Sequence, residues 1–292
     1  MITIANPIYD IVFKKLMEDL AAAQSLLSAL LGEEVEILEL LPQERTLSMP
    51  GTQGVTVMRF DYRATLRYKD KIKKVLIELQ KSKNVEDIGR FRRYLGENYQ
   101  VPDVREGVES YLPIIAIYLL GFTLNYQPAI LRVNPVTTDL SSTPSVVEVL
   151  DDVMVEGLTH TSYFVQIPRL PKRYGNRVER VLAVFAQNWV LREDKHLMQV
   201  PDELRDDPLI RPLLNRLERI IADPEVIRQA AEEEGFEKHY VRSLAKSKAE
   251  GKAEGALEKA KETARNLKKI GLSLEQIAKA TGLSELEING LS

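Results

Sequence analysis

Two acidic residues on neighbouring predicted strands, Asp61 and Glu78, have the residue types and spacing that metal-assisted chemistry requires. A hairpin that turns at residues 69–70 pairs Tyr68 with Lys71, and the same register places Asp61 directly opposite Glu78. Opposed residues of a hairpin share one face with their Cβ atoms about 5 Å apart, and like charges placed there repel each other. A hard divalent cation would compensate them, because Mg²⁺ prefers oxygen ligands and often takes one or two carboxylates.

The surroundings of this pair indicate what such a cation would act on. Gln80 lies two residues past Glu78 and therefore points to the same face of the strand. Residues 59–93 hold twelve Lys or Arg and five Asp or Glu, a net charge of +7 in a chain of −3. A metal site within a basic patch suits a phosphodiester substrate. The residues alone leave a second interpretation open, an outer sheet face on which Arg59 and Arg63 balance the two carboxylates.

The elements that would position these residues follow from hydropathy patterns. Apolar residues alternate with polar ones over 55–66, which predicts a strand with one buried face. We expect helices over 9–31 and 86–99, strands over 35–41, 55–66 and 74–80, and a buried strand over 113–120. The buried strand 113–120 follows a strand and a helix, which predicts a parallel neighbour for the strand 74–80.

The rest of the chain is predicted to be mainly helical. One further strand is expected over 162–167, and helices are expected over 177–191, 209–221 and 224–233. The composition shifts near residue 235, and residues 246–269 are rich in Lys, Ala and Glu, which indicates a solvated helix or a helical linker.

The last segment has a helix-turn-helix outline. Ser273 with Gln276 and Ser284 with Glu287 form two capping boxes, and Gly282 is expected in the turn between two short helices. The residues after Ser284 include two Glu and no Lys or Arg, unlike helices that read DNA bases. This composition favours a protein-contact or self-regulatory module over sequence-specific DNA reading.

Composition excludes several classes of protein. The 292 residues contain no Cys, which rules out disulfide scaffolds, Cys-ligated zinc and thiol catalysis. Phosphate-loop, dinucleotide, zinc-protease and nucleophile-elbow motifs are absent, and the three His are scattered. No leader is recognised, and the longest apolar stretch, 111–122, is shorter than a membrane span. We therefore expect a soluble, cytoplasmic protein with no membrane partner.

These motifs and their order resemble the PD-(D/E)XK nuclease superfamily, and more finely its recombination-promoting nuclease, or transposase-like, group. The similarity rests on the opening YDIVFK (9–14), the strand motifs RFD (59–61) and IELQ (77–80), Gly107 and Tyr111 before an Ile-rich strand, and the tail with AEG repeats ending in GLSLEQIAKATGLS. The resemblance covers nearly the whole chain.

The resemblance implies an α/β fold with a restriction-endonuclease-like mixed central sheet flanked by helices, followed by a helical C-terminal region. It implies a nuclease-like domain over 1–195, a helical extension over 196–235 and a Lys/Ala/Glu-rich tail over 236–292. The implied activity is Mg²⁺-dependent cleavage of DNA, with Mn²⁺ as an alternative ion and little sequence specificity, in recombination, mobile-element or phage-related transactions. Asp61 and Glu78 would hold the metal. Gln80 stands where the superfamily has Lys, and it would orient a water or bond a phosphate oxygen.

Supporting residues are predicted on the next helix and beyond Gln80. Arg90, Arg93 and Tyr94 fall at helical spacing and either reach phosphate or form a solvated basic face. Lys81 and Lys83 point away from Gln80 if the strand continues, and one of them could serve the site only if the strand ends there.

Four further residues are candidates for the site. Asp10 and Lys14, one helical turn apart, either form a surface ion pair or approach the active site, as the opening motif suggests. Arg59 and Arg63 flank Asp61 and would contact the DNA backbone.

Two other functions stay open. One is a non-catalytic nucleic-acid-binding or regulatory assembly module that retains the nuclease fold, and the other is a toxin-like nuclease inhibited by its own helical tail. The helical C-terminal region is also the expected surface for a homo-oligomer.

Overall fold

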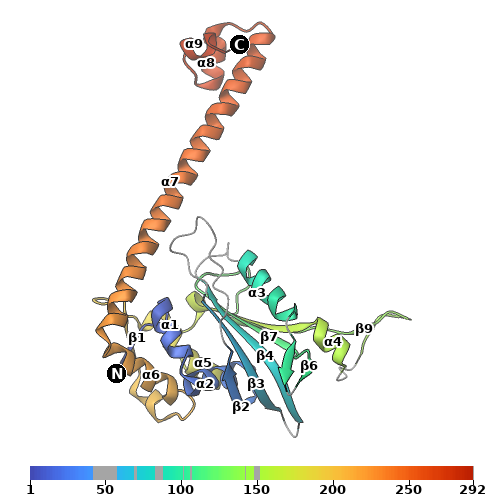
Figure 1. Cartoon of the computed structure of the whole chain (residues 1–292). Helices are drawn as coiled ribbons and strands as arrows, with labels where there is room; N and C mark the ends of the chain where they lie inside the picture. Colours follow the sequence, from blue (N-terminus) through green and yellow to red (C-terminus); the bar gives the residue numbers. More distant parts are fainter. Residues whose placement is uncertain are drawn as a thin grey trace. The chain divides into compact units, whose positions relative to one another are not determined.

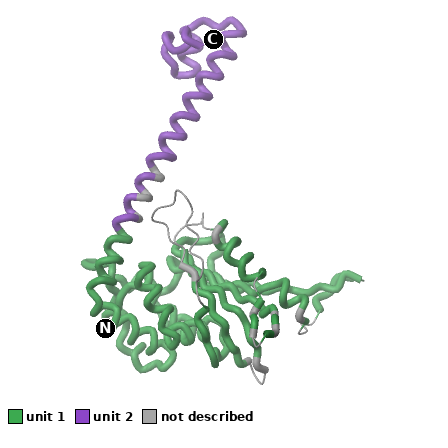
Figure 2. Tube along the Cα trace, viewed as in Figure 1, with its two compact units in different colours: residues 1–234 green, residues 235–292 purple. Residues whose placement is uncertain are grey.

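The computed structural model describes residues 1–41, 58–68, 71–82, 88–100, 102–105, 107–141, 143–147 and 152–291. The chain divides into two compact units, residues 1–234 and 235–292 (Figure 2). The first unit is mixed α/β and the second is helical. Residues 55–57, the predicted start of the first long strand, lie outside the described residues.

A six-stranded mixed sheet forms the centre of the first unit (Figure 1). Its order is β2 (Glu34–Leu40), β3 (Met58–Tyr68), β4 (Lys71–Ser82), β7 (Ile114–Leu120), β11 (His160–Gln166) and β8 (Ile130–Val133). β4, β7 and β11 run parallel, and the other pairs are antiparallel. The predicted parallel pairing of the buried strand with the second hairpin strand is therefore confirmed.

One face of the sheet carries the main hydrophobic core. Phe60, Tyr62, Ala64 and Leu66 are buried on β3, as the alternation predicts. The helices α1 (Asp10–Met17), α2 (Leu20–Leu31), α5 (Arg177–Leu182) and α6 (Arg211–Ile221) lie on this side (Figure 1).

The single helix predicted over 9–31 is two helices. α1 ends at Met17, and the Asp19 side chain accepts hydrogen bonds from the backbone N–H groups of Ala21 and Ala22, which starts α2. Gly32 ends α2 in the left-handed conformation (φ 72°), as predicted.

The opposite face is covered by α3 (Ile88–Gln100), whose Phe91 and Leu95 pack with Tyr118 of β7. Five small elements complete this part of the unit. They are α4 (Val153–Leu158), the strand pair β5 (Asp103–Arg105) and β6 (Val108–Ser110), and the pair β9 (Thr138–Asp139) and β10 (Ser145–Val146).

Residues 196–234 complete the first unit. β12 (Leu197–Val200) pairs antiparallel with β1 (Ile2–Ala5), and α6 places Leu213 and Leu217 in the main core. The helix predicted over 177–191 is α5 followed by two 3₁₀ turns, Ala183–Phe185 and Gln187–Trp189. Two more such turns span Ile167–Arg169 and Asp202–Asp206.

The second unit is built on the end of α7 (Pro224–Lys269), followed by α8 (Leu274–Thr281) and α9 (Glu285–Asn289). Both predicted capping boxes form, and Gly282 occupies the turn with φ 74°. A small core unites the three helices through Ala264, Ile277 and Ile288. The helix predicted over 224–233 and the Lys/Ala/Glu-rich segment are thus one continuous helix.

Candidate functional site

The hairpin β3–β4 has the predicted register, with Tyr68 opposite Lys71 and Asp61 opposite Glu78. Both carboxylates lie on the sheet face that α3 covers, because the alternate residues of β3 and β4 fill the main core on the other face. Glu78 is fully buried and Asp61 is half-buried. An ionised carboxylate is costly to bury unless other groups compensate it, so the surroundings of Glu78 matter.

Gln80 lies on the same face as Glu78 and is fully buried as well. Its Nε2 donates a hydrogen bond to Glu78 Oε1. Its Oε1 is buried and has no hydrogen-bond partner among the described residues. A buried acceptor without a partner costs free energy unless a water or a ligand satisfies it, so this atom indicates a site that something else occupies.

Asn98 of α3 joins the two carboxylates and was not predicted from the sequence. Its Nδ2 lies 3.3 Å from Asp61 Oδ1 and 3.2 Å from Glu78 Oε2. A sequence signal for this residue does exist. Phe91, Leu95 and Asn98 are spaced four and three residues apart, so Asn98 lies on the same face of α3 as the two apolar residues that pack on the sheet.

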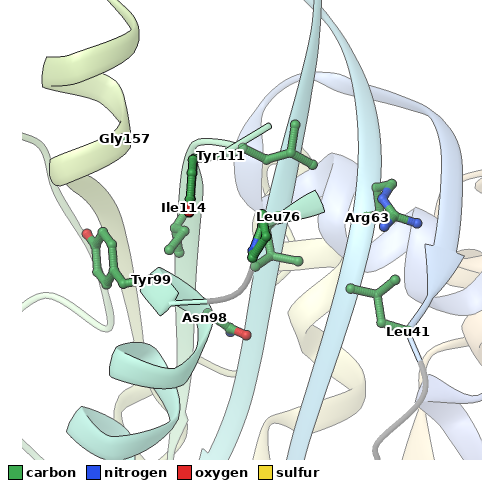
Figure 3. A pocket seen from close by; sticks show the side chains of 10 residues that line it. Leu41, Arg63, Leu76, Asn98, Tyr99, Tyr111, Ile114 and Gly157 are labelled. Carbon is green, nitrogen blue, oxygen red and sulfur yellow. The ribbon is translucent and has the colours of Figure 1, made fainter. Parts of the chain in front are cut away.

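A cavity of about 120 Å³ opens beside Asn98 on the same face (Figure 3). Leu76 and Ile114, neighbours across β4 and β7, form its floor, and Arg63 lies opposite Leu76 on β3. It is lined by Leu41, Arg63, Leu76, Asn98, Tyr99, Pro102, Tyr111, Leu112, Ile114 and Gly157.

Two aromatic side chains, Tyr118 on β7 and His160 on β11, have shifted pKa values. Burial, then the charge of Glu78, and then Tyr99 raise the pKa of Tyr118, which pairs with Gln80 in the sheet register. The Tyr99 hydroxyl lies 2.7 Å from His160 Nδ1, and burial lowers the pKa of His160. The Tyr118 hydroxyl and the His160 ring are therefore both neutral at pH 7.

Lys81 lies on the other face of the sheet, because β4 continues to Ser82 and keeps its alternation. It is 1% exposed, and its Nζ lies 2.7 Å from Asp10 Oδ1 and 2.5 Å from the Ile8 carbonyl oxygen. The ammonium also lies 5.3 Å from the centre of the Phe13 ring. Asp10 therefore forms an ion pair with Lys81 on the core side of the sheet, on the face opposite Glu78.

Among the other predicted residues, Lys14 and Arg63 each lie close to a carboxylate outside the Asp61–Glu78 pair. Lys14 lies 4.0 Å from Glu18 instead of pairing with Asp10. Arg63 lies on the same face as Asp61, and its Nη1 lies 2.9 Å from Glu39 Oε2. Arg93 is exposed and Tyr94 is half-buried on α3. Lys83 and the side chains of Arg59 and Arg90 lie outside the described residues.

The donor set at the site is made of oxygen ligands. Within the described ranges, no group of three or more His, Asp or Glu side chains is placed to hold a metal ion. Two carboxylates with a neighbouring buried amide oxygen nevertheless fit Mg²⁺, which keeps several waters and needs only one or two carboxylates. The residues present therefore suit a hard cation bound through few protein ligands.

No helix among the described residues combines the length and apolar character needed to cross a lipid bilayer. Comparison of the chain with known proteins finds no matching family model, no matching curated protein and no matching solved structure.

Proposed function

We propose that this protein is a divalent-metal-dependent DNA endonuclease that cleaves phosphodiester bonds with little sequence specificity. One observation carries the proposal: Asp61 and Glu78 lie directly opposite each other, joined by the Asn98 amide and flanked by the buried Gln80. Paired carboxylates with an unsatisfied amide oxygen are a donor set that a hard cation completes.

The order of elements supports a restriction-endonuclease-like version of the fold. The elements follow the order that the sequence resemblance implies. Helices α1 and α2 precede the antiparallel pair β3–β4 with its acidic residues, and α3 and the parallel strand β7 come after it. On this basis we propose membership of the PD-(D/E)XK superfamily and its recombination-promoting group, with a role in recombination, mobile-element or phage-related DNA transactions. The helical second unit is the proposed surface for self-association.

The residues of the site have separable roles. Asp61 and Glu78 would hold Mg²⁺, or Mn²⁺ in its place, and Asn98 would keep the two carboxylates aligned. When bound, the cation supplies an activated water and stabilises negative charge on the phosphate. Gln80 Oε1 accepts a hydrogen bond from a water and so orients it within the buried site. Arg63 lies at the edge of the cavity on the same face, where its guanidinium contacts a phosphate.

The proposal is tested by nicking of supercoiled plasmid with Mg²⁺ or EDTA. The variants Asp61→Asn and Glu78→Gln keep the side-chain shape and remove one charge each. The matched control is Glu36→Gln, a carboxylate of β2 in the same sheet that pairs with Arg67. We expect Mg²⁺-dependent nicking that falls at least about 100-fold in both site variants, since metal catalysis contributes several kcal/mol, and is unchanged in the control.

Other outcomes point elsewhere. Absence of nicking by the unaltered protein, together with intact DNA binding in all variants, would favour the non-catalytic binding module. Equal nicking by the unaltered protein and the Asp61→Asn variant would place the active site outside this carboxylate pair.

A further inference from the structure

The cavity beside the carboxylates has the lining of a nucleotide subsite. Tyr99 and Tyr111 supply aromatic surface, and Leu76 and Ile114 supply an apolar floor. Arg63 and Asn98 add polar groups to the lining (Figure 3), and Asn98 also contacts both carboxylates. Concave sites with apolar walls and a few convergent polar groups bind small planar ligands.

The cavity is adjacent to the place where a phosphate would react. Leu76 precedes Glu78 by two residues on the same face, which is about 7 Å along a strand. Asn98 belongs to both sites, because it lines the cavity and contacts both carboxylates. A phosphate held at the carboxylates would therefore have its neighbouring nucleotide at this cavity.

The Tyr99 ring is held in place for such a role. Its hydroxyl lies 2.7 Å from His160 Nδ1, and the two rings meet edge to face with their centroids 5.9 Å apart. Tyr111, in contrast, is 56% exposed at the mouth of the cavity. One fixed and one accessible aromatic side chain form a platform against which a base can stack.

We infer that this cavity receives the unstacked base of a single-stranded DNA segment, so that the substrate class is unpaired DNA. The inference rests on the proposed function for the position of the phosphate. Bases within a duplex are stacked and cannot enter a concave cavity unless they leave the stack. Aromatic stacking accepts every base, which agrees with the low sequence specificity proposed above. Lys74, exposed two residues before Leu76 on the same face, is placed to contact the sugar–phosphate backbone.

The test is fluorescence anisotropy of the full chain in EDTA, so that no cleavage occurs. The probes are a labelled single-stranded 15-mer and a blunt hairpin duplex of the same sequence. The variant is Tyr111→Ala, and the matched control is Tyr126→Ala, a tyrosine that is 63% exposed and is not among the cavity-lining residues. We expect tighter binding of the single strand, weakened about 5- to 150-fold by Tyr111→Ala, with duplex binding and the control unchanged.

Equal affinity for the two probes, or equal weakening of both by Tyr111→Ala, would overturn the inference. Tighter binding of a matched RNA 15-mer would overturn its assignment to DNA. The two proposals fail separately. Tyr111-dependent binding of single strands, without metal-dependent cleavage of either the plasmid or the single-stranded 15-mer, would overturn only the nuclease. Metal-dependent cleavage without a single-strand preference in binding would overturn only the subsite.

Discussion

Replacing Lys81 with methionine tests whether this side chain stabilises the fold from the core face of β4 or takes part in catalysis on the opposite face. The residue follows Gln80 directly, and Gln80 stands where the proposed superfamily has a lysine, so Lys81 is the alternative source of that positive charge. The structure instead places its ammonium on the core side, 2.7 Å from Asp10 Oδ1 and 2.5 Å from the Ile8 carbonyl oxygen. Methionine keeps most of the apolar stem and removes the charge.

The expected loss of stability follows from burial. Lys81 is 1% exposed, whereas Asp10 is 18% exposed. Breaking a buried ion pair by removing one partner costs about 3–5 kcal/mol, because the remaining charge is stranded. Since Asp10 regains some contact with water, we expect the lower end, about 3 kcal/mol. For a unit of this size that lowers the melting temperature by about 6–12 °C.

The assay is urea unfolding monitored by circular dichroism, and plasmid nicking is measured on the same preparations of folded protein. We expect Lys81→Met to lose stability but to keep its nicking rate per folded molecule. Adding Asp10→Asn should cost less than its effect in the unaltered protein, because it removes the stranded carboxylate. Stability within about 1 kcal/mol of the unaltered protein, or nicking lost from a fully folded variant, would refute this reasoning.

Three smaller perturbations test other parts of the molecule. Asn98→Leu removes the amide that contacts both carboxylates and should lower the free energy of unfolding by about 1–3 kcal/mol in EDTA. The loss should be smaller in Mg²⁺, because a bound cation would compensate the two carboxylates. An equal loss in both conditions would count against the metal site. Tyr62→Phe removes the hydroxyl that donates to the Met17 carbonyl oxygen at 2.8 Å and should cost about 1 kcal/mol by urea unfolding. Burial, and then the charges of Glu18 and Asp61, raise the pKa of Tyr62 in the folded protein. The unaltered protein should therefore lose stability as the pH rises above about 10, where the phenol ionises in the unfolded chain only. The Phe variant should lose less stability over the same pH range. Ser284→Ala removes the cap of α9 and should weaken hydrogen-exchange protection there by about 0.5–2 kcal/mol, with the sheet unaffected.

The hairpin register was predictable because two independent local signals agree. The period-two alternation of β3 fixes which side chains are buried, and the expected turn between Tyr68 and Lys71, whose residues 69–70 lie outside the described ranges, fixes which residues are opposed. The capping boxes and Gly32 were predictable for the same reason, since each depends on a few neighbouring residues.

Features that depend on distant residues or on continuity were not predictable. The pairing of β1 with β12 joins residues almost 200 positions apart, and a strand as short as ITIA (2–5) carries no local signal of its partner. The break between α1 and α2 was missed because the helical periodicity continues across it, although the Asp19 cap was visible in the sequence. Gly251 and Gly255 suggested a loosened helical linker, yet α7 continues through both. A glycine costs a helix only about 1 kcal/mol, which neighbouring good helix formers offset.

Asn98 illustrates why a site is harder to predict than a fold. The two carboxylates were found because they share a hairpin, whereas Asn98 comes from a helix and reaches them only through the packing of α3 on the sheet. The direction of Lys81 was likewise decided by whether β4 ends at Gln80 or at Ser82, a difference of two residues at a strand end. Strand ends are set by tertiary contacts, and a shift of one residue changes the face.

The alternation of β4 also explains how an acidic pair can be kept in place. Ile77, Leu79 and Lys81 anchor one face of the strand in the main core, and Glu78 and Gln80 alternate with them on the other. A rotation or slip of β4 that relieved the repulsion between the carboxylates would expose those core residues, and burying each apolar side chain is worth about 1.5–3 kcal/mol. The hydrophobic face thus supplies the free energy that holds Glu78 opposite Asp61, and a cation that binds there finds its ligands already positioned.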